Sequence, residues 1–273
     1  MNLESFKTNE GIKLNYQLIT QKGSKANLVL VHGYSGNHTV WLNVIKNLKQ
    51  KYNILLFDLR GHGLSDKPKK KSLYTIPNFV SDLEALINHT KLKNVYLVGY
   101  SSGGLFSMYY SLKHKKNVKG IILISTNHTN FLKFRLPFLD SLTFLVKGIF
   151  NTCAFLFRNF NKKKYNFLDY TKLKSKSPVF KELSLVPLDI YFWCINTLLD
   201  KNMEGKINEI DVPVLIVRGS KDLLTTRREC SYLAKKIRSS EFKTILNIDH
   251  HIVLNKPKKV ASLIDSFIAK QNN

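Results

Sequence analysis

Residues 95–110 read VYLVGYSSGGLFSMYY, and this stretch decides the fold. It opens on aliphatic, aromatic and β-branched residues, which favour a buried strand. It closes on a run without glycine that favours a helix. Between the two lies GYSSG, a G-x-S-x-G pattern centred on Ser101. A serine in this setting sits on a tight, strained strand-to-helix turn with its hydroxyl pushed outward. The stretch therefore predicts a nucleophilic serine.

The length and composition of the chain bound the classes of protein it can be. Its 273 residues, 44% of them hydrophobic, suit one large α/β domain with an insertion. No apolar run reaches the length of a transmembrane helix, and charges stand where a secretory signal needs its apolar segment. We therefore expect a cytoplasmic protein. Three scattered cysteines, Cys153, Cys194 and Cys230, fit neither a disulfide framework nor a zinc site. We expect no metal and no other cofactor.

The net charge of +24 is extreme, but its distribution is even. Lysines occur along the whole chain, and no nucleic-acid recognition motif accompanies them. A solvated basic surface accounts for this pattern without a nucleic-acid partner. A basic surface is still attracted to acidic surfaces, so we expect at most weak, salt-sensitive contact with anionic membranes. The expected partner is a small-molecule ester, with or without an acyl chain.

Apolar strands alternate with helices over residues 1–126 and again over 210–273. An antiparallel strand pair is expected within residues 4–20, and a helix over Val40–Gln50. Several later strands, such as NLVLV at 27–31, are continuously apolar, as strands buried on both faces are. This alternation predicts an α/β core with a doubly wound, mainly parallel sheet of eight strands.

Residues 127–209 break the alternation and are predicted to form a helical cap over the carboxyl ends of the strands, where ligands bind in open α/β sheets. Apolar side chains surround any helix formed within residues 131–160, so we expect burial on more than one side, against a second helix at Tyr191–Leu199 or an apolar ligand. Packing of the cap alone explains these residues, and so does an acyl pocket above the serine. The predicted substrate contacts are Tyr100, Phe134, Phe138 and Trp193.

A serine becomes nucleophilic at neutral pH only beside a base, and that base needs an orienting acid. Asp222 and His250 each follow a predicted strand, at the same sheet edge as Ser101. The chain order Ser, Asp, His is one of three known orders for such triads. His251 is the alternative base. No carboxylate follows the strand at 118–125 closely enough to replace Asp222.

The chain resembles the α/β hydrolases over nearly its full length. The resemblance rests on VLVHGYSG at 29–36, DLRGHGLSD at 58–66, GYSSGG at 99–104, VRGSKD at 217–222 and DHHIVLNKP at 249–257. It implies that Ser101 is the nucleophile, His250 the general base and Asp222 the acid. It also implies an oxyanion hole made of the backbone N–H groups of Tyr34 and Ser102.

The same resemblance separates the two neighbouring histidines and assigns three other polar residues. In the family the catalytic histidine usually stands seven positions before a proline, and Pro257 then selects His250 over His251. His32 is expected to shape the oxyanion loop rather than react. Asp58 and His62 are expected to be turn and packing residues.

A serine triad on this fold predicts a hydrolase of carboxylic esters, acting like an esterase or lipase through an acyl-enzyme. A C–C bond hydrolase and a cofactor-free perhydrolase would use the same triad, and a non-enzymatic ligand receptor is the alternative from another class. The serine excludes epoxide hydrolase and haloalkane dehalogenase chemistry, because both need a carboxylate nucleophile.

Overall fold

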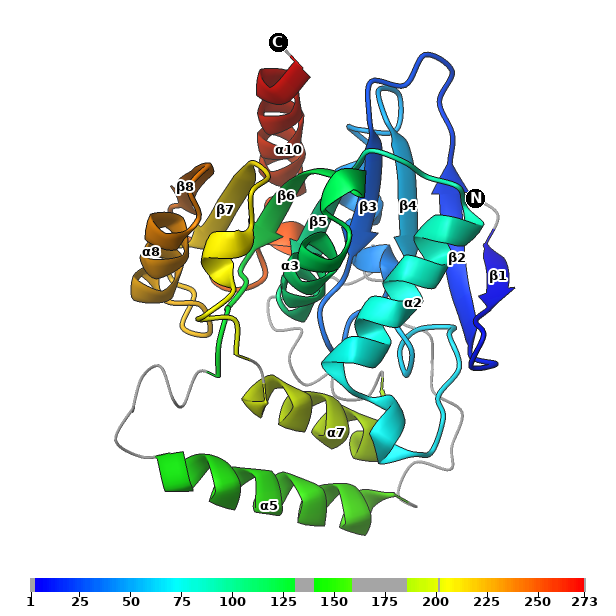
Figure 1. Ribbon diagram of the computed structural model, residues 1–273, viewed down its shortest axis with the longest axis vertical. Helices are drawn as coiled ribbons and strands as arrows, with labels where there is room; N and C mark the ends of the chain where they lie inside the picture. The colour runs from blue at the N-terminus through cyan, green and yellow to red at the C-terminus, as the bar shows by residue number, and fades with distance from the viewer. Residues whose placement is uncertain (1–2, 131–139, 159–185, 201, 273) are drawn as a thin grey trace.

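An eight-stranded sheet runs through the centre of the computed structural model, which describes residues 3–130, 140–158, 186–200 and 202–272 (Figure 1). The strand order is β1-β2-β4-β3-β5-β6-β7-β8. The pairs β1·β2 and β2·β4 are antiparallel, and the remaining pairs are parallel. This confirms the predicted mainly parallel, eight-stranded sheet. The strands are β1 (Glu4–Lys7), β2 (Lys13–Ile19), β3 (Asn27–Val31), β4 (Asn53–Phe57), β5 (Val95–Tyr100), β6 (Val118–Ile124), β7 (Val214–Gly219) and β8 (Ser240–Ile245).

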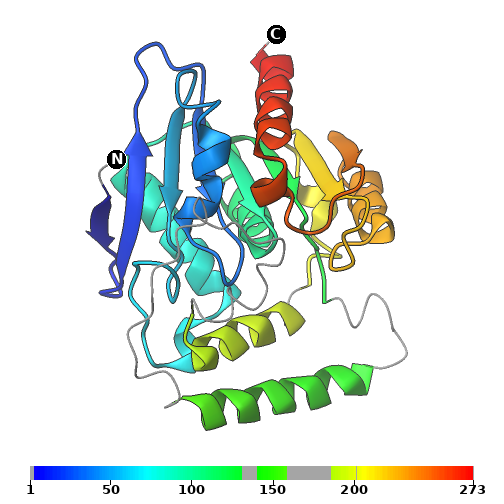
Figure 2. The ribbon, with the colours of Figure 1, turned by 180° about the vertical axis from the view of Figure 1, so that it is seen from behind.

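Helices cover both faces of the sheet, so the sheet is doubly wound as predicted. Helices α2, α3 and α8 lie on the face toward the viewer in Figure 1, and α10 lies on the face seen in Figure 2. Each face has its own apolar core. The helices are α1 (Leu42–Ile45), α2 (Ile76–His89), α3 (Ser102–Lys113), α5 (Asp140–Phe157), α7 (Leu188–Leu199), α8 (Arg227–Lys236), α9 (Ile252–Asn255) and α10 (Pro257–Asn272), with short 3-10 helices η1 (His38–Trp41), η2 (Lys71–Leu73), η3 (Lys115–Asn117) and η5 (Ile207–Glu209).

The helix expected over Val40–Gln50 is much shorter in the structure. The side chain of Asn37 accepts the N–H of Thr39 at 2.9 Å, which starts a 3-10 turn, η1, in place of a helix. Only the four residues of α1 then form an α-helix. The apolar periodicity correctly predicted which residues are buried, since Trp41 and Val44 are fully buried. It identified the buried side of the segment but not its hydrogen-bond pattern.

Two helices between β6 and β7 lie beyond the end of the sheet at which the chain leaves β6. Helix α7 is the nearer to the sheet, and α5 packs against its outer side (Figures 1 and 2). The ring of Phe192 lies 5.9 Å from that of Phe150 and 6.1 Å from that of Phe157. The second helix predicted near Tyr191–Leu199 is therefore present. The cap limits at 127 and 209 remain a prediction.

The outer side of α5 differs from the expectation of burial on more than one side. Phe144 is 83% exposed and Leu156 is 65% exposed, whereas Ala154 on the side of α7 is buried. Apolar residues around a helix show that water contact is unfavourable, but they do not show which side of the helix is covered. Within the described residues, α5 is buried on one side.

Candidate active site

Ser101 lies on the sharp turn between β5 and α3, at the middle of the sheet. Its backbone has φ +54° and ψ −120°, a left-handed region that costs free energy for a residue with a side chain. The flanking glycines allow the turn to be this tight. A Cβ on Gly103 would lie 2.2 Å from the carbonyl oxygen of Val31, and one on Gly99 would lie 2.3 Å from the Cα of Gly104. The G-x-S-x-G pattern is thus a steric requirement of this turn.

His250 connects the Ser101 hydroxyl to the carboxylate of Asp222. Its Nε2 lies 3.1 Å from Ser101 Oγ, and its Nδ1 lies 3.0 Å from Asp222 Oδ2 and 3.2 Å from Oδ1. The three residues follow β5, β7 and β8, and Ser101 and His250 are 149 positions apart in sequence. When Nδ1–H donates to the carboxylate, Nε2 is left as the acceptor for the serine proton. The structure therefore brings together the three residues predicted to form the triad.

Asp222 is almost fully buried and held as an anion. Its Oδ1 accepts the backbone N–H groups of Leu224 and Thr225, each at 2.9 Å. Burial by itself would raise the pKa of this carboxyl. The hydrogen bond and the charge of His250, together with the N–H of Thr225, outweigh burial and hold that pKa below its usual value. Asp222 is therefore ionised at neutral pH, as an orienting acid must be.

Two hydroxyl groups donate hydrogen bonds to the backbone carbonyl of His250. The sequence motifs did not predict this role for either residue. The hydroxyl of Tyr100 donates to the carbonyl oxygen of His250 at 3.2 Å, and that of Ser125 at 3.4 Å. Tyr100 is mostly buried, with its ring 5.5 Å from the imidazole. A substrate contact for Tyr100 remains a prediction. Ser125 directly follows strand β6, and a polar residue at that strand end was the available signal.

The alternative base, His251, occupies a different environment. Its ring centroid lies 6.1 Å from that of His250, with the two planes perpendicular. Its Nδ1 lies 3.5 Å from the carboxylate of Asp249. Burial lowers the pKa of His251, and the neighbouring charge of Asp249 only partly opposes this effect. The imidazole that hydrogen-bonds Ser101 is that of His250.

The two predicted oxyanion donors lie next to each other, one at the start of α3 and one on the loop after β3. Ser102 is the first residue of α3, where backbone N–H groups have no partner inside the helix. The N–H of Tyr34, which follows β3, donates to the Ser102 hydroxyl at 2.8 Å. An oxyanion must therefore either share that N–H with the hydroxyl or displace the hydroxyl from it. The sequence could not show this side-chain contact.

Buried histidines fix the loop that carries Tyr34. The Nε2 of His32 accepts the N–H of Leu59 at 3.0 Å, and its Nδ1 lies 2.7 Å from the carbonyl oxygen of Gly33. Burial lowers the pKa of His32 to about 4 and that of His62 to about 3, so both rings are neutral at pH 7. Asp58 accepts the N–H groups of His38 and Leu64. These contacts fit the expected loop and turn roles.

The remaining predicted substrate contacts have different positions. Phe134 and Phe138 lie outside the described residues. Trp193 is half-buried on α7, with its ring 5.7 Å from that of Tyr74.

In the described residues no cluster of histidine, cysteine and acidic side chains could hold a metal ion. Likewise, none of the described helices is both long and apolar enough to span a membrane.

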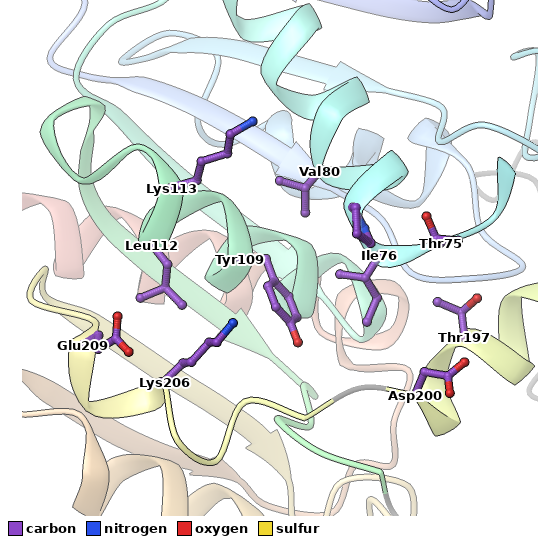
Figure 3. A pocket seen from close by; sticks show the side chains of 11 residues that line it. Thr75, Ile76, Val80, Tyr109, Leu112, Lys113, Thr197, Asp200, Lys206 and Glu209 are labelled. Atoms are coloured by element: carbon purple, nitrogen blue, oxygen red, sulfur yellow. The ribbon is translucent and has the colours of Figure 1, made fainter. Parts of the chain in front are cut away.

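A cavity of about 840 Å³ lies between α2, the second half of α3, the end of α7 and η5 (Figure 3). Its walls are mainly apolar, with Tyr109 at the centre and Lys113 and Lys206 at its sides. Tyr109 stands eight residues after Ser101, about 12 Å along the helix. None of the three triad residues lines this cavity, so it is separate from the Ser101 site.

Comparisons with known proteins place this geometry in a family. The sequence profile of the alpha/beta hydrolase fold matches residues 26–257. The protein belongs to this family. A proline iminopeptidase of Lactobacillus helveticus is 26% identical, over 94% of this chain and 95% of its own. A monoacylglycerol lipase of Mus musculus is 22% identical, over 97% of this chain and 82% of its own.

Solved structures agree on the fold. A thermophilic esterase from Thermogutta terrifontis superposes with a TM-score of 0.79, at 20% identity and with all of both chains covered. An identity this low supports the fold alone. The comparisons support a hydrolase, and the relatives include proteins named for ester and for peptide substrates.

Proposed function

We propose that this protein is a serine hydrolase of carboxylic esters, with Ser101 as nucleophile, His250 as base and Asp222 as orienting acid. The observation that carries the proposal is the position of His250, with Nε2 3.1 Å from Ser101 Oγ and Nδ1 3.0 Å from Asp222. These are hydrogen-bond distances on both sides of one imidazole, as general-base catalysis requires.

In the first half-reaction Ser101 Oγ attacks the ester carbonyl carbon, and its proton passes to His250 Nε2. The buried carboxylate of Asp222 stabilises the imidazolium. The negative charge on the former carbonyl oxygen is met by the Ser102 N–H, with Tyr34 as the second donor. Collapse of this intermediate breaks the C–O bond, and the leaving alcohol takes the proton from Nε2.

The second half-reaction repeats these steps with water. His250 takes a proton from the water that attacks the acyl carbon, and returns that proton to Ser101 as the acid leaves. The strained φ of Ser101 and the fixed loops around it keep the reacting groups in place through both steps. The sequence of events needs neither metal nor organic cofactor.

A pair of chromogenic substrates tests ester against amide hydrolysis, because the relatives include a lipase and an iminopeptidase. We expect turnover of p-nitrophenyl esters and little turnover of prolyl p-nitroanilide. A matched Ser101→Ala variant should lose the ester activity. Turnover of the prolyl anilide alone would make the protein a peptidase and refute the ester proposal.

Acyl-chain length tests the apolar substrate contacts proposed above Ser101. Each methylene moved from water into an apolar site contributes roughly 0.8 kcal/mol. In a series from C2 to C12, kcat/KM should therefore rise by tens of times towards the medium chains. A steady fall in kcat/KM from C2 upward would contradict the proposed acyl pocket. Turnover of a dienoate instead of esters would favour the C–C hydrolase.

A further inference from the structure

Helix α5 presents an apolar row to solvent. The exposed positions 144, 145, 148, 149, 152, 155 and 156 follow the helical repeat and lie on one side. Five of them are large and apolar, and each is at least half exposed: Phe144, Leu145, Ile149, Phe155 and Leu156. We call these five residues the α5 outer face. Because these side chains are exposed while α5 packs against α7, the face lies on the side of α5 that α7 does not cover. Helix α7 itself lies between α5 and the sheet (Figures 1 and 2).

Contiguous exposed apolar patches on a soluble domain mark interaction sites. The polar content of the α5 outer face indicates which kind of partner it suits. The single polar side chain on the exposed side of the helix is that of Thr152, whose hydroxyl donates to the Gly148 carbonyl within the same helix at 3.1 Å. The face thus offers almost no hydrogen-bonding groups outward. Protein interfaces carry roughly one hydrogen bond per 100–200 Å², whereas lipid hydrocarbon needs none.

Positive charge lines one edge of this face. By helical periodicity Lys147, Asn151 and Arg158 lie on the flank next to Phe144 and Phe155. Arg158 stacks over the Phe155 ring at 4.4 Å, and Lys147 pairs with Asp200 across to the end of α7.

The lysines at the start of η2 extend this basic edge. The Nζ of Lys71 donates to the side chain of Asn151 at 2.7 Å, which brings the exposed residues Lys70 and Lys71 beside α5. The preceding Lys69 pairs instead with the buried Asp189 of α7. An apolar helix face with a basic flank is the pattern of helices that lie in the interface of an anionic bilayer. The same charges, on a chain of net charge +24, oppose the close approach of a second copy.

We propose that the α5 outer face docks the protein onto an anionic lipid surface, with the five apolar side chains entering the acyl boundary and the adjacent cations meeting the headgroups. This goes beyond the expected weak electrostatic contact, because the apolar row adds a component that salt does not screen. The proposal concerns binding and does not depend on which bond Ser101 cleaves.

The test uses the full chain and vesicles of phosphatidylcholine with about 30% phosphatidylserine, in a sedimentation assay. Leu156→Ser should lower the partition coefficient about tenfold, by removal of apolar burial. The matched control is Leu246→Ser, a leucine that is 74% exposed and lies outside α5 and the triad. It should bind within twofold of the unchanged protein. Melting temperatures of both variants report any loss of folding.

A second pair of variants tests the basic edge. Lys70→Gln with Lys71→Gln should weaken binding to the anionic vesicles about tenfold, while Lys235→Gln with Lys236→Gln on α8 should change it little. Binding in 0.5 M salt should persist in part, because the apolar contact remains. The proposal is overturned if the unchanged protein does not sediment with these vesicles, or if both leucine variants bind alike. It is also overturned if sedimentation velocity without lipid shows a dimer that Leu156→Ser dissociates.

Discussion

The Ser101 turn and helix α5 are both rich in apolar sequence, yet they differ in how tightly the structure constrains each residue. Every residue of β5 is buried, and the turn leaves no room for a side chain at Gly99 or Gly103. Helix α5 has Ala154 buried on one side and Phe144 in solvent on the other. Close packing on all sides fixes residue identity. A helix covered on one side leaves its outer residues available for another purpose.

The largest expected effect concerns the two neighbouring histidines at the Ser101 site. His250→Ala should reduce kcat by about three to four orders of magnitude, because the general base and the partner of Asp222 are lost together. His251→Ala is the matched control and should retain activity within about tenfold, since its imidazole lies beside Asp249. Steady-state kinetics on one ester would measure both. The reverse result would show that His251 is the base.

The two regions should respond in opposite directions to the same substitution. Gly103→Ala places a Cβ 2.2 Å from a backbone oxygen of β3 and should cost several kcal/mol or prevent folding. Gly148→Ala on α5 meets no atom within 4 Å and should stabilise the protein by roughly 0.5–1 kcal/mol through helix propensity. Urea unfolding measures both variants. Equal effects would contradict the contrast between a closely packed turn and a helix open on one side.

Acid should weaken the region around Ser101 through its buried histidines. The pKa values of His32 and His62 are lowered by burial to about 4 and about 3, whereas an unfolded histidine titrates near ~6.5. Below that pH the unfolded chain binds protons that the native chain does not. The free energy of unfolding should therefore fall by about 1.4 kcal/mol per pH unit for each ring between pH 6.5 and 4.5.

Urea titrations at several pH values would show this slope. His62→Gln should flatten it by removing one of the two rings. An unfolding free energy that is constant from pH 7 to 5 would contradict the neutral, buried state assigned to both histidines.

The smallest expected effect concerns the hydroxyl of Ser102. Ser102→Ala removes the acceptor of the Tyr34 N–H and leaves that donor to the oxyanion, so kcat should change by less than about tenfold. Ser102→Thr keeps a hydroxyl and serves as the comparison. A loss of a hundredfold or more in the alanine variant alone would mean that the hydroxyl itself binds the oxyanion.

The sequence predicted the Ser101 turn well because its constraints are local. The glycines, the apolar strand and the helix are adjacent in the chain, and the steric demands of the turn explain each residue type. The positions of Asp222 and His250 followed from strand order, and five motifs supported them. The sequence carried a signal for Ser125, a polar residue at the end of a predicted strand, but not for its contact with His250. That contact and the one from Tyr100 join residues 125 and 150 positions apart.

Prediction failed where the sequence pattern does not specify geometry. For the segment from Val40 onward, apolar spacing gave the buried side but not the 3-10 turn that Asn37 starts. For α5, the apolar residues were visible, but the side left in solvent was not. Contact of the Ser102 hydroxyl with the Tyr34 N–H depends on a side-chain rotamer, for which the sequence holds no signal.

The most direct measurement is covalent labelling with a fluorophosphonate, followed by peptide mass spectrometry. One adduct per chain should form on Ser101, because His250 activates that hydroxyl across 3.1 Å. Labelling should disappear in Ser101→Ala, become far slower in His250→Ala and persist in His251→Ala. A folded protein that takes up no label, or that is labelled on another residue, would show that Ser101 is not the nucleophile.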